Sequence, residues 1–140
     1  MSLAHHKLVA WQRADALFIK LHRLSLKVFP AFERFELGSQ LRRAAFSVAV
    51  NIVEGFATQF IRKRLNFLDH STSSLAEVGY CIEAAQKLGY ISQKDATELD
   101  IEIRQVGAPL AGLIRAERMR SKAGTATTVV LVFLLGSRLL

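Results

Sequence analysis

The chain has 140 residues, of which 51% are hydrophobic and 22% charged, and this composition excludes an intrinsically disordered protein. Its 19 Lys and Arg against 12 Asp and Glu residues give a formal net charge of +7, which favours anionic partners. The one cysteine, Cys81, cannot form an internal disulfide, and this indicates a reducing, cytoplasmic location.

The first expected helix spans about residues 8–28 and is followed by Phe29-Pro30, where it must end because the residue before proline avoids the helical region. Its apolar residues recur at alternating spacings of three and four, which is typical of a helix packed against other helices. The members of this stripe are Ala10, Ala14, Leu17, Leu21, Leu24 and Val28.

The second expected helix opens near Gly38-Ser39, with Ser39 as its N-cap, and closes at Gly55 as its C′ glycine. Two apolar faces flank a narrow polar stripe. One face holds Leu41, Ala45, Val48 and Ile52; the other holds Phe46, Ala49, Val50 and Val53; the polar stripe holds Gln40, Arg43, Ser47, Asn51 and Glu54. A second apolar face predicts an oligomer interface, the alternative being that this is the most buried helix of a single bundle.

The third expected helix covers about residues 62–88, and small residues at 71–74 would let a neighbouring helix approach closely. Its stripe holds Leu65, Leu68, Thr72, Leu75, Gly79 and Ile82. Gly89 ends this helix, and Ser92 with Asp95 resembles a capping box at the start of the next. So short a connection predicts that the third and fourth helices are antiparallel neighbours.

The fourth expected helix covers about residues 93–122, and Pro109 predicts a kink or break near residues 105–108. Its stripe holds Ala96, Leu99, Ile103, Val106, Leu110 and Leu113. The fold class is therefore all-α, an up-down four-helix bundle over residues 1–122. Arg115, Arg118, Arg120 and Lys122 would suit the dipole at the C-terminus of this helix.

Residues 123–140 form an apolar C-terminal extension, in which the run 129–135 is prone to form a strand. The apolar or threonine stretch 125–135 is shorter than the ~20 residues that a membrane-spanning helix needs, so we expect no membrane partner. The alternative is that this stretch dips into a membrane without crossing it. Covering a subunit seam and pairing with a neighbour are both open for this extension.

The sequence contains no recognisable catalytic or metal-binding pattern. No Glu has His three residues later, as a di-iron bundle would require, and one Cys cannot begin a zinc site. We expect solvated His22 and His70, and a buried, structural Cys81. The sequence therefore predicts no cofactor, no metal and no enzymatic activity.

Clustered positive charge is the remaining functional signal. Arg62, Lys63 and Arg64 begin the third helix, where cations oppose the helix dipole and so indicate a use beyond helix stability. Further basic residues are Arg42 at the start of the second helix and a ridge on the first helix formed by Lys20, Arg23 and Lys27. These residues predict a surface that binds the phosphates of DNA or RNA; the alternative is an ordinary solubilising surface.

One stretch resembles the signature of a known bacterial family: Phe29-Pro30, Glu33, Leu37, Gln40-Leu41-Arg42-Arg43-Ala44-Ala45, Ser47 and Asn51-Ile52-Val53-Glu54-Gly55. This is the four-helix-bundle family first noticed as open reading frames inside intervening sequences of large-subunit ribosomal RNA genes. The chain is also similar to the accessory variability protein of diversity-generating retroelements. The resemblance implies a homopentamer and, as partners, nucleic acid and a reverse transcriptase.

The resemblance also assigns roles within the second helix. Arg43, Asn51 and Glu54 match the family's recurrent polar positions, and a structural role at helix ends or between subunits is expected for them. Together these observations predict a non-catalytic, basic homo-oligomer that binds nucleic acid or a nucleoprotein partner. The alternative is a protein-interaction scaffold whose apolar extension or bundle groove holds a partner helix.

Overall fold

Four helices form an up-down bundle in the computed structural model, which describes the backbone of residues 3–136 and the side chains of residues 3–128 and 131. The helices are α1 (Val9–Val28), α2 (Leu37–Ala57), α3 (Ile61–Lys87) and α4 (Gln93–Gly136). Two short 3-10 helices, η1 (Ala4–Lys7) and η2 (Ala31–Arg34), precede α1 and α2. No strand occurs within residues 3–136, which confirms the all-α prediction.

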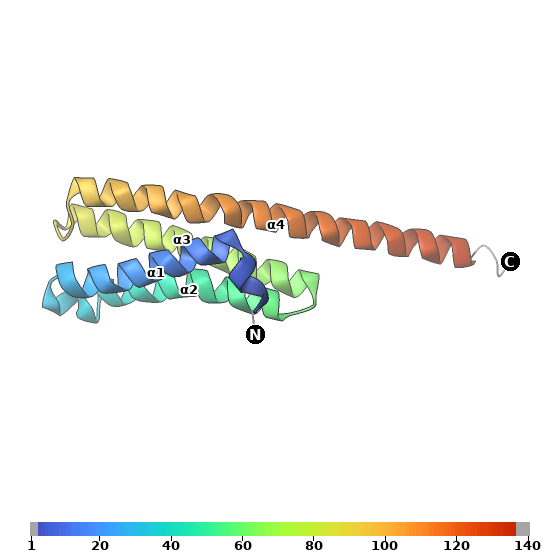
Figure 1. Ribbon diagram of the computed structural model, residues 1–140, viewed down its shortest axis with the longest axis horizontal. Coiled ribbons are helices and arrows are strands. Elements are labelled where there is room, and N and C mark those ends of the chain that lie inside the picture. The colour runs from blue at the N-terminus through green and yellow to red at the C-terminus, as the bar shows by residue number, and fades with distance from the viewer. Residues whose placement is uncertain (1–2, 137–140) are drawn as a thin grey trace.

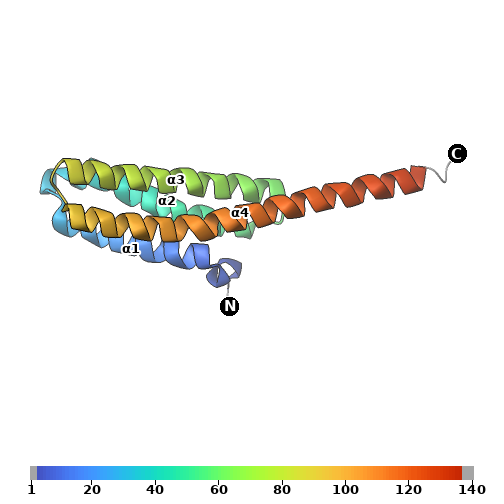
Figure 2. The ribbon, with the colours of Figure 1, turned by 90° about the horizontal axis from the view of Figure 1, so that it is seen from above.

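Each helix runs antiparallel to the next, and α4 closes the bundle by packing against both α3 and α1 (Figures 1 and 2). The predicted stripe of α2 is fully buried at Leu41, Ala45, Val48 and Ile52. On α3 the stripe is shifted, because Ser71 and Val78 are buried whereas Thr72 is exposed. Ser71 donates a hydrogen bond to the Val48 carbonyl at 2.7 Å, so small residues do bring α2 and α3 close together.

The turn between α3 and α4 has the predicted chemistry. Gly89 adopts a φ of 78°, in the left-handed region that favours glycine. The Asp95 backbone N–H donates to the Ser92 hydroxyl, and that hydroxyl donates to the Asp95 carboxylate at 2.7 Å, which confirms the capping pair.

The beginning of α2 differs from the prediction. The helix starts at Leu37 rather than at Ser39, and a glutamate upstream caps it: the Leu37 N–H donates to Glu33 Oε2 at 2.9 Å. The Glu33 Oε1 atom accepts a hydrogen bond from the Tyr90 hydroxyl at 2.7 Å. A buried carboxylate thus ties the α1–α2 connection to the α3–α4 turn, and this contact raises the pKa of the Tyr90 phenol. Gly55, the expected C-cap, lies inside the helix, which continues to Ala57.

Of the predicted kink or break near residues 105–108, the break does not occur, because α4 is one continuous helix across Pro109. Proline lacks an N–H, so the carbonyl of Gln105 one turn earlier loses its helical partner. The guanidinium of Arg13 on α1 donates to that carbonyl at 2.8 Å. A contact between two helices therefore satisfies the acceptor that proline leaves open.

The predicted end of the fourth helix near Lys122 is also wrong. The helix continues to Gly136 and leaves the bundle as a single projecting rod (Figure 1). The strand-prone run 129–135 is helical in backbone, and the hydroxyls of Thr125, Thr127 and Thr128 donate to carbonyls one turn back. Within the described residues, no helix is both long and apolar enough to span a bilayer.

Candidate nucleic-acid interface

Positive charge concentrates where α4 leaves the bundle. Residues 61–69 of α3 and 115–122 of α4, which we call the basic end, contain seven Lys and Arg residues against two carboxylates. The cations are Arg62, Lys63, Arg64, Arg115, Arg118, Arg120 and Lys122, and the carboxylates are Asp69 and Glu117. This end of the molecule therefore carries five of the seven net positive charges of the chain.

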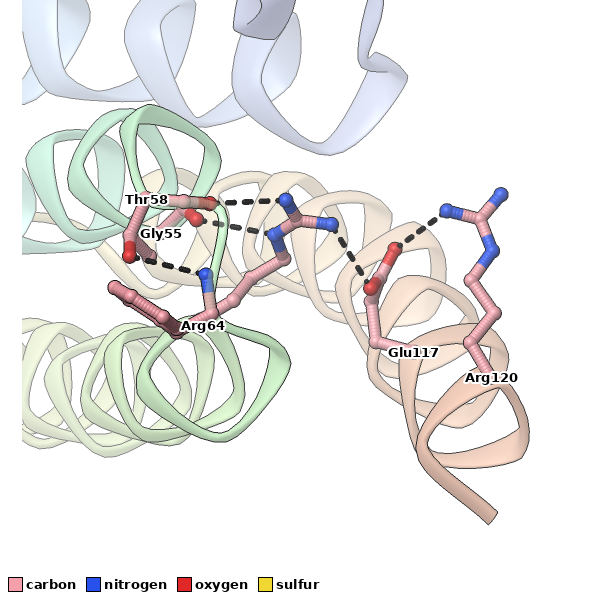
Figure 3. A network of polar contacts seen from close by, with 6 residues as sticks. Gly55, Thr58, Arg64, Glu117 and Arg120 are labelled. Carbon is pink, nitrogen blue, oxygen red and sulfur yellow. Dashed lines mark hydrogen bonds and ion pairs between the residues drawn. The ribbon is translucent and has the colours of Figure 1, made fainter. Parts of the chain in front are cut away.

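Arg64 differs from its basic neighbours because its guanidinium is occupied by structural contacts (Figure 3). It donates to the Gly55 carbonyl at 3.1 Å, to the Thr58 carbonyl at 3.0 Å and to Glu117 Oε2 at 3.0 Å. It also lies 4.7 Å from the centre of the Phe56 ring. We conclude that Arg64 fastens the α2–α3 connection to α4, and that its donors are committed to this role.

Glu117 is the centre of the same network. Its side chain is only 2% exposed, and its second oxygen accepts a hydrogen bond from Arg120 at 3.1 Å (Figure 3). Both oxygens of a buried carboxylate are thus paired with cations, as burial of a charge requires. Asp69 forms a further, exposed ion pair with Arg118 at 3.3 Å.

Arg62 and Lys63 are exposed at the start of α3, and Arg115 and Lys122 are exposed on α4. Within the described residues none of these four forms an ion pair with a carboxylate. Because α4 continues beyond Lys122, its basic residues lie within a helix rather than at its C-terminus, and the helix dipole does not account for them.

The predicted ridge on α1 lies apart from the basic end. Lys20 forms an ion pair with Glu102, which precedes Arg115 along α4 by about 20 Å. Arg23 and Lys27 are exposed. Arg42 on α2 is half-buried and donates to the Ser25 hydroxyl and the Arg34 carbonyl, so its guanidinium holds the α1–α2 connection.

The second apolar face of α2 is incompletely covered by the rest of the chain. Phe46 is 53% exposed and touches the Phe18 ring edge-on at a centroid distance of 5.6 Å, while Val50 and Val53 are half-buried. On the polar stripe, the Asn51 amide donates to the Ser47 carbonyl at 2.8 Å. The two charged members of the stripe, Arg43 and Glu54, are exposed.

The structure also shows the surroundings of the cysteine and of two histidines that the sequence analysis considered. Cys81 is buried as expected, and burial followed by the nearby charge of Glu77 raises the pKa of its thiol. His22 and His70 are exposed. The described residues contain no group of three or more potential metal ligands.

The sequence profile of the 23S rRNA-intervening sequence proteins matches residues 6–112. The chain belongs to this family. The match covers α1, α2, α3 and the first part of α4 but stops before Arg115, so the α4 half of the basic end and the projecting helix lie outside it.

A solved structure has the same fold. It is a protein of unknown function from the S23 ribosomal protein family of Bacteroides thetaiotaomicron, with a TM-score of 0.71 and 18% sequence identity. The likeness covers 76% of this chain and 96% of that protein, and at this identity it shows the fold alone. No curated protein matches the chain.

Sequence reasoning found Arg62 and Lys63 but set aside the basic residues of α4 as an ordinary helix C-terminus. It missed them because it placed the end of α4 near Lys122, about two heptads before the observed end at Gly136. The absence of proline between Lys122 and Gly136 was the signal that the helix could continue.

Proposed function

We propose that this protein is a non-catalytic, basic homo-oligomer that binds the phosphate backbone of nucleic acid through its basic end. The observation that carries the proposal is the convergence of α3 and α4 cations at one end of the bundle, five charges in excess. Clustered Lys and Arg bind nucleic acid by releasing counterions from its phosphates, and this needs no base-specific pocket.

The uncovered face of α2 supports the oligomeric part of the proposal. An exposed Phe46 beside half-buried Val50 and Val53 is the kind of apolar surface that another subunit covers. A ring of subunits, five in the assembly that the resemblance implies, would repeat the basic end around one axis. Repetition multiplies the charge that faces a ligand, and therefore its affinity for a polyanion. The molar mass measured by light scattering tests the subunit number.

Charge reversal at the basic end tests the binding surface. The variant R62E/K63E removes two unpaired cations and places carboxylates in the first turn of α3, where they suit the helix dipole, so the fold is preserved. We expect affinity for DNA and for RNA to fall by about tenfold or more, whatever the sequence. For the wild-type chain, affinity should fall about 10³-fold between about 50 and about 200 mM salt.

The matched control is R23E/K27E, which makes the same change of charge on the α1 ridge. The proposal expects this variant to bind nearly as the wild type does. An equal loss in both variants would place the site elsewhere, and no retention of nucleic acid by the wild type at low salt would overturn nucleic-acid binding. Salt-insensitive binding to a protein would instead favour the scaffold alternative. A reverse transcriptase as partner stays a prediction.

A further inference from the structure

An exposed aromatic ring lies at the edge of the basic end. Phe60 is the last residue of the short connection between α2 and α3, and its side chain is 64% exposed. Arg62 and Lys63 follow it in the first turn of α3; both are exposed and, within the described residues, neither forms an ion pair. No carboxylate occurs in residues 55–68. The charged residues nearest to the ring in the chain are therefore all cations.

The other exposed rings have different surroundings. Among the described residues, further phenylalanine and tyrosine side chains that are more than half exposed are Phe32, Phe35, Phe46 and Tyr80. Phe32 and Phe35 each precede a glutamate in the chain, and Tyr80 lies one helical turn from two glutamates. Phe46 belongs to the uncovered apolar face of α2. Of these five rings, only Phe60 borders the basic end.

Hydrogen bonds hold the backbone that carries the ring. The Phe60 N–H donates to the Thr58 hydroxyl at 3.3 Å, and the Phe60 carbonyl accepts from the Arg64 N–H at 2.9 Å. The Arg64 guanidinium donates to the Thr58 carbonyl and to Glu117, so the connection is also tied to α4 (Figure 3). An exposed ring on a fixed backbone loses little conformational freedom when it binds a ligand, which favours binding.

We propose that Phe60 stacks on an unpaired base of single-stranded nucleic acid, while Arg62 and Lys63 bind the neighbouring phosphates. This inference rests on the proposed function and names its ligand as a single strand rather than a duplex. A nucleotide joins a flat base to a phosphate through one sugar, so a ring with cations in the next turn binds both parts. Every base has a π face, so stacking needs no base-specific pocket.

Charge and stacking favour different ligands. A duplex has the denser phosphate charge, and binding by charge alone is therefore stronger for the duplex. Its internal bases are covered on both faces by their neighbours, so an aromatic ring adds affinity only for a single strand. Stacking also releases no counterions, whereas each lost phosphate contact weakens the salt dependence of binding. The contributions of the ring and of the cations can thus be measured separately.

Phe60→Ala tests the ring. Because this side chain is exposed, its removal leaves the bundle core intact. Affinity is measured by fluorescence anisotropy for a short labelled DNA strand of mixed sequence and for the duplex that it forms with its complement. We expect the affinity for the single strand to fall about tenfold with unchanged salt dependence, and that for the duplex to stay within about twofold of the wild-type value. Equal losses for both ligands would overturn the stacking.

The matched control is Phe35→Ala, which removes a ring that is 82% exposed at the opposite end of the bundle. It should leave both affinities unchanged. R62E/K63E, in contrast, should weaken the binding of both ligands and reduce its salt dependence. If R62E/K63E has this effect and Phe60→Ala has none, the proposed function holds and the stacking is overturned.

Two further substitutions separate stacking from a general apolar contact. Phe60→Trp provides a larger π surface and should keep or raise the affinity for the single strand, whereas Phe60→Leu is apolar without a π face and should lose as much as Phe60→Ala. With Trp11→Phe as the background, the emission of Phe60→Trp should be quenched by the single strand and not by the duplex. Wild-type affinity of Phe60→Leu would overturn the stacking.

A second copy of the chain and a lipid surface are other partners that an exposed ring beside cations fits. Light scattering of Phe60→Ala tests the first, and flotation with vesicles of phosphatidylglycerol and phosphatidylcholine tests the second. A molar mass below that of the wild type would assign the ring to a subunit contact and overturn the proposal. Flotation of the wild type that Phe60→Ala abolishes would overturn it in favour of the membrane. An unchanged mass without flotation supports the stacking.

Discussion

The two ends of the bundle are each fastened by one buried glutamate, but with different partners. At one end Glu33 accepts hydrogen bonds from the Leu37 N–H and the Tyr90 hydroxyl, which are neutral donors. At the basic end Glu117 is held between the cations Arg64 and Arg120. The same residue type thus caps a helix at one end and neutralises surplus positive charge at the other.

The difference has a physical consequence. A carboxylate held by neutral donors contributes roughly what a helix cap contributes, whereas removing the acid from a buried ion pair leaves a cation without compensation. The basic end should therefore depend on its glutamate more strongly. Loss of Glu117 would also increase the electrostatic repulsion among the cations that surround it.

The largest effect is expected for Glu117→Ala. This change leaves the half-buried guanidinium of Arg64 without its carboxylate and should lower the free energy of unfolding by about 3 kcal/mol, measured by urea denaturation. Arg120, the exposed partner of Glu117, provides the control. Arg120→Ala should lower the free energy of unfolding by no more than about 1 kcal/mol. Similar values for both variants would contradict the view that burial makes the pair critical.

A smaller effect is expected at the opposite end for Glu33→Ala. Loss of the cap on Leu37 should lower the free energy of unfolding by about 1–2 kcal/mol in the same assay. The Tyr90 phenol should also lose its raised pKa, which phenolate absorbance during an alkaline titration detects. Because the folded chain holds the Tyr90 proton more tightly, this contact stabilises below the ordinary tyrosine pKa and is lost as the pH rises through the raised value.

If Glu33→Ala destabilises the chain as much as Glu117→Ala does, the proposed difference between the two ends is wrong. Glu33→Gln refines the result, since an amide keeps one oxygen acceptor for the Leu37 N–H.

The smallest effect concerns the N-terminal 3-10 helix. Burial, and then the neighbouring charge of His6, lowers the pKa of His5, whose ring also touches Trp11 at a centroid distance of 4.7 Å. The folded state therefore binds fewer protons than the unfolded state, so this contact is fully stable above about pH 6.5 and weakens as the pH falls through the lowered pKa. NMR titration should show His5 titrating below the ordinary histidine value, with a parallel change in Trp11 fluorescence.

His5→Gln should abolish the His5 titration and reduce the fluorescence change. A His5 titration at or above the ordinary value would show that its buried position is not maintained in solution.

The sequence by itself determined the number of helices, their order and the turn chemistry at Gly89 and Ser92, because these depend on spacing and on residues close together in the chain. It also located the cations at the start of α3 and the uncovered face of α2.

Only the tertiary structure decided what joins distant segments. Arg64 and Glu117 are 53 residues apart in the chain, and Arg13 reaches the carbonyl left open by Pro109 across 92 positions. No local pattern predicts such pairs, since each partner is one of many charged or polar residues and the choice is made by how the helices pack. The packing of α4 along α3 likewise placed the basic residues of the two helices side by side.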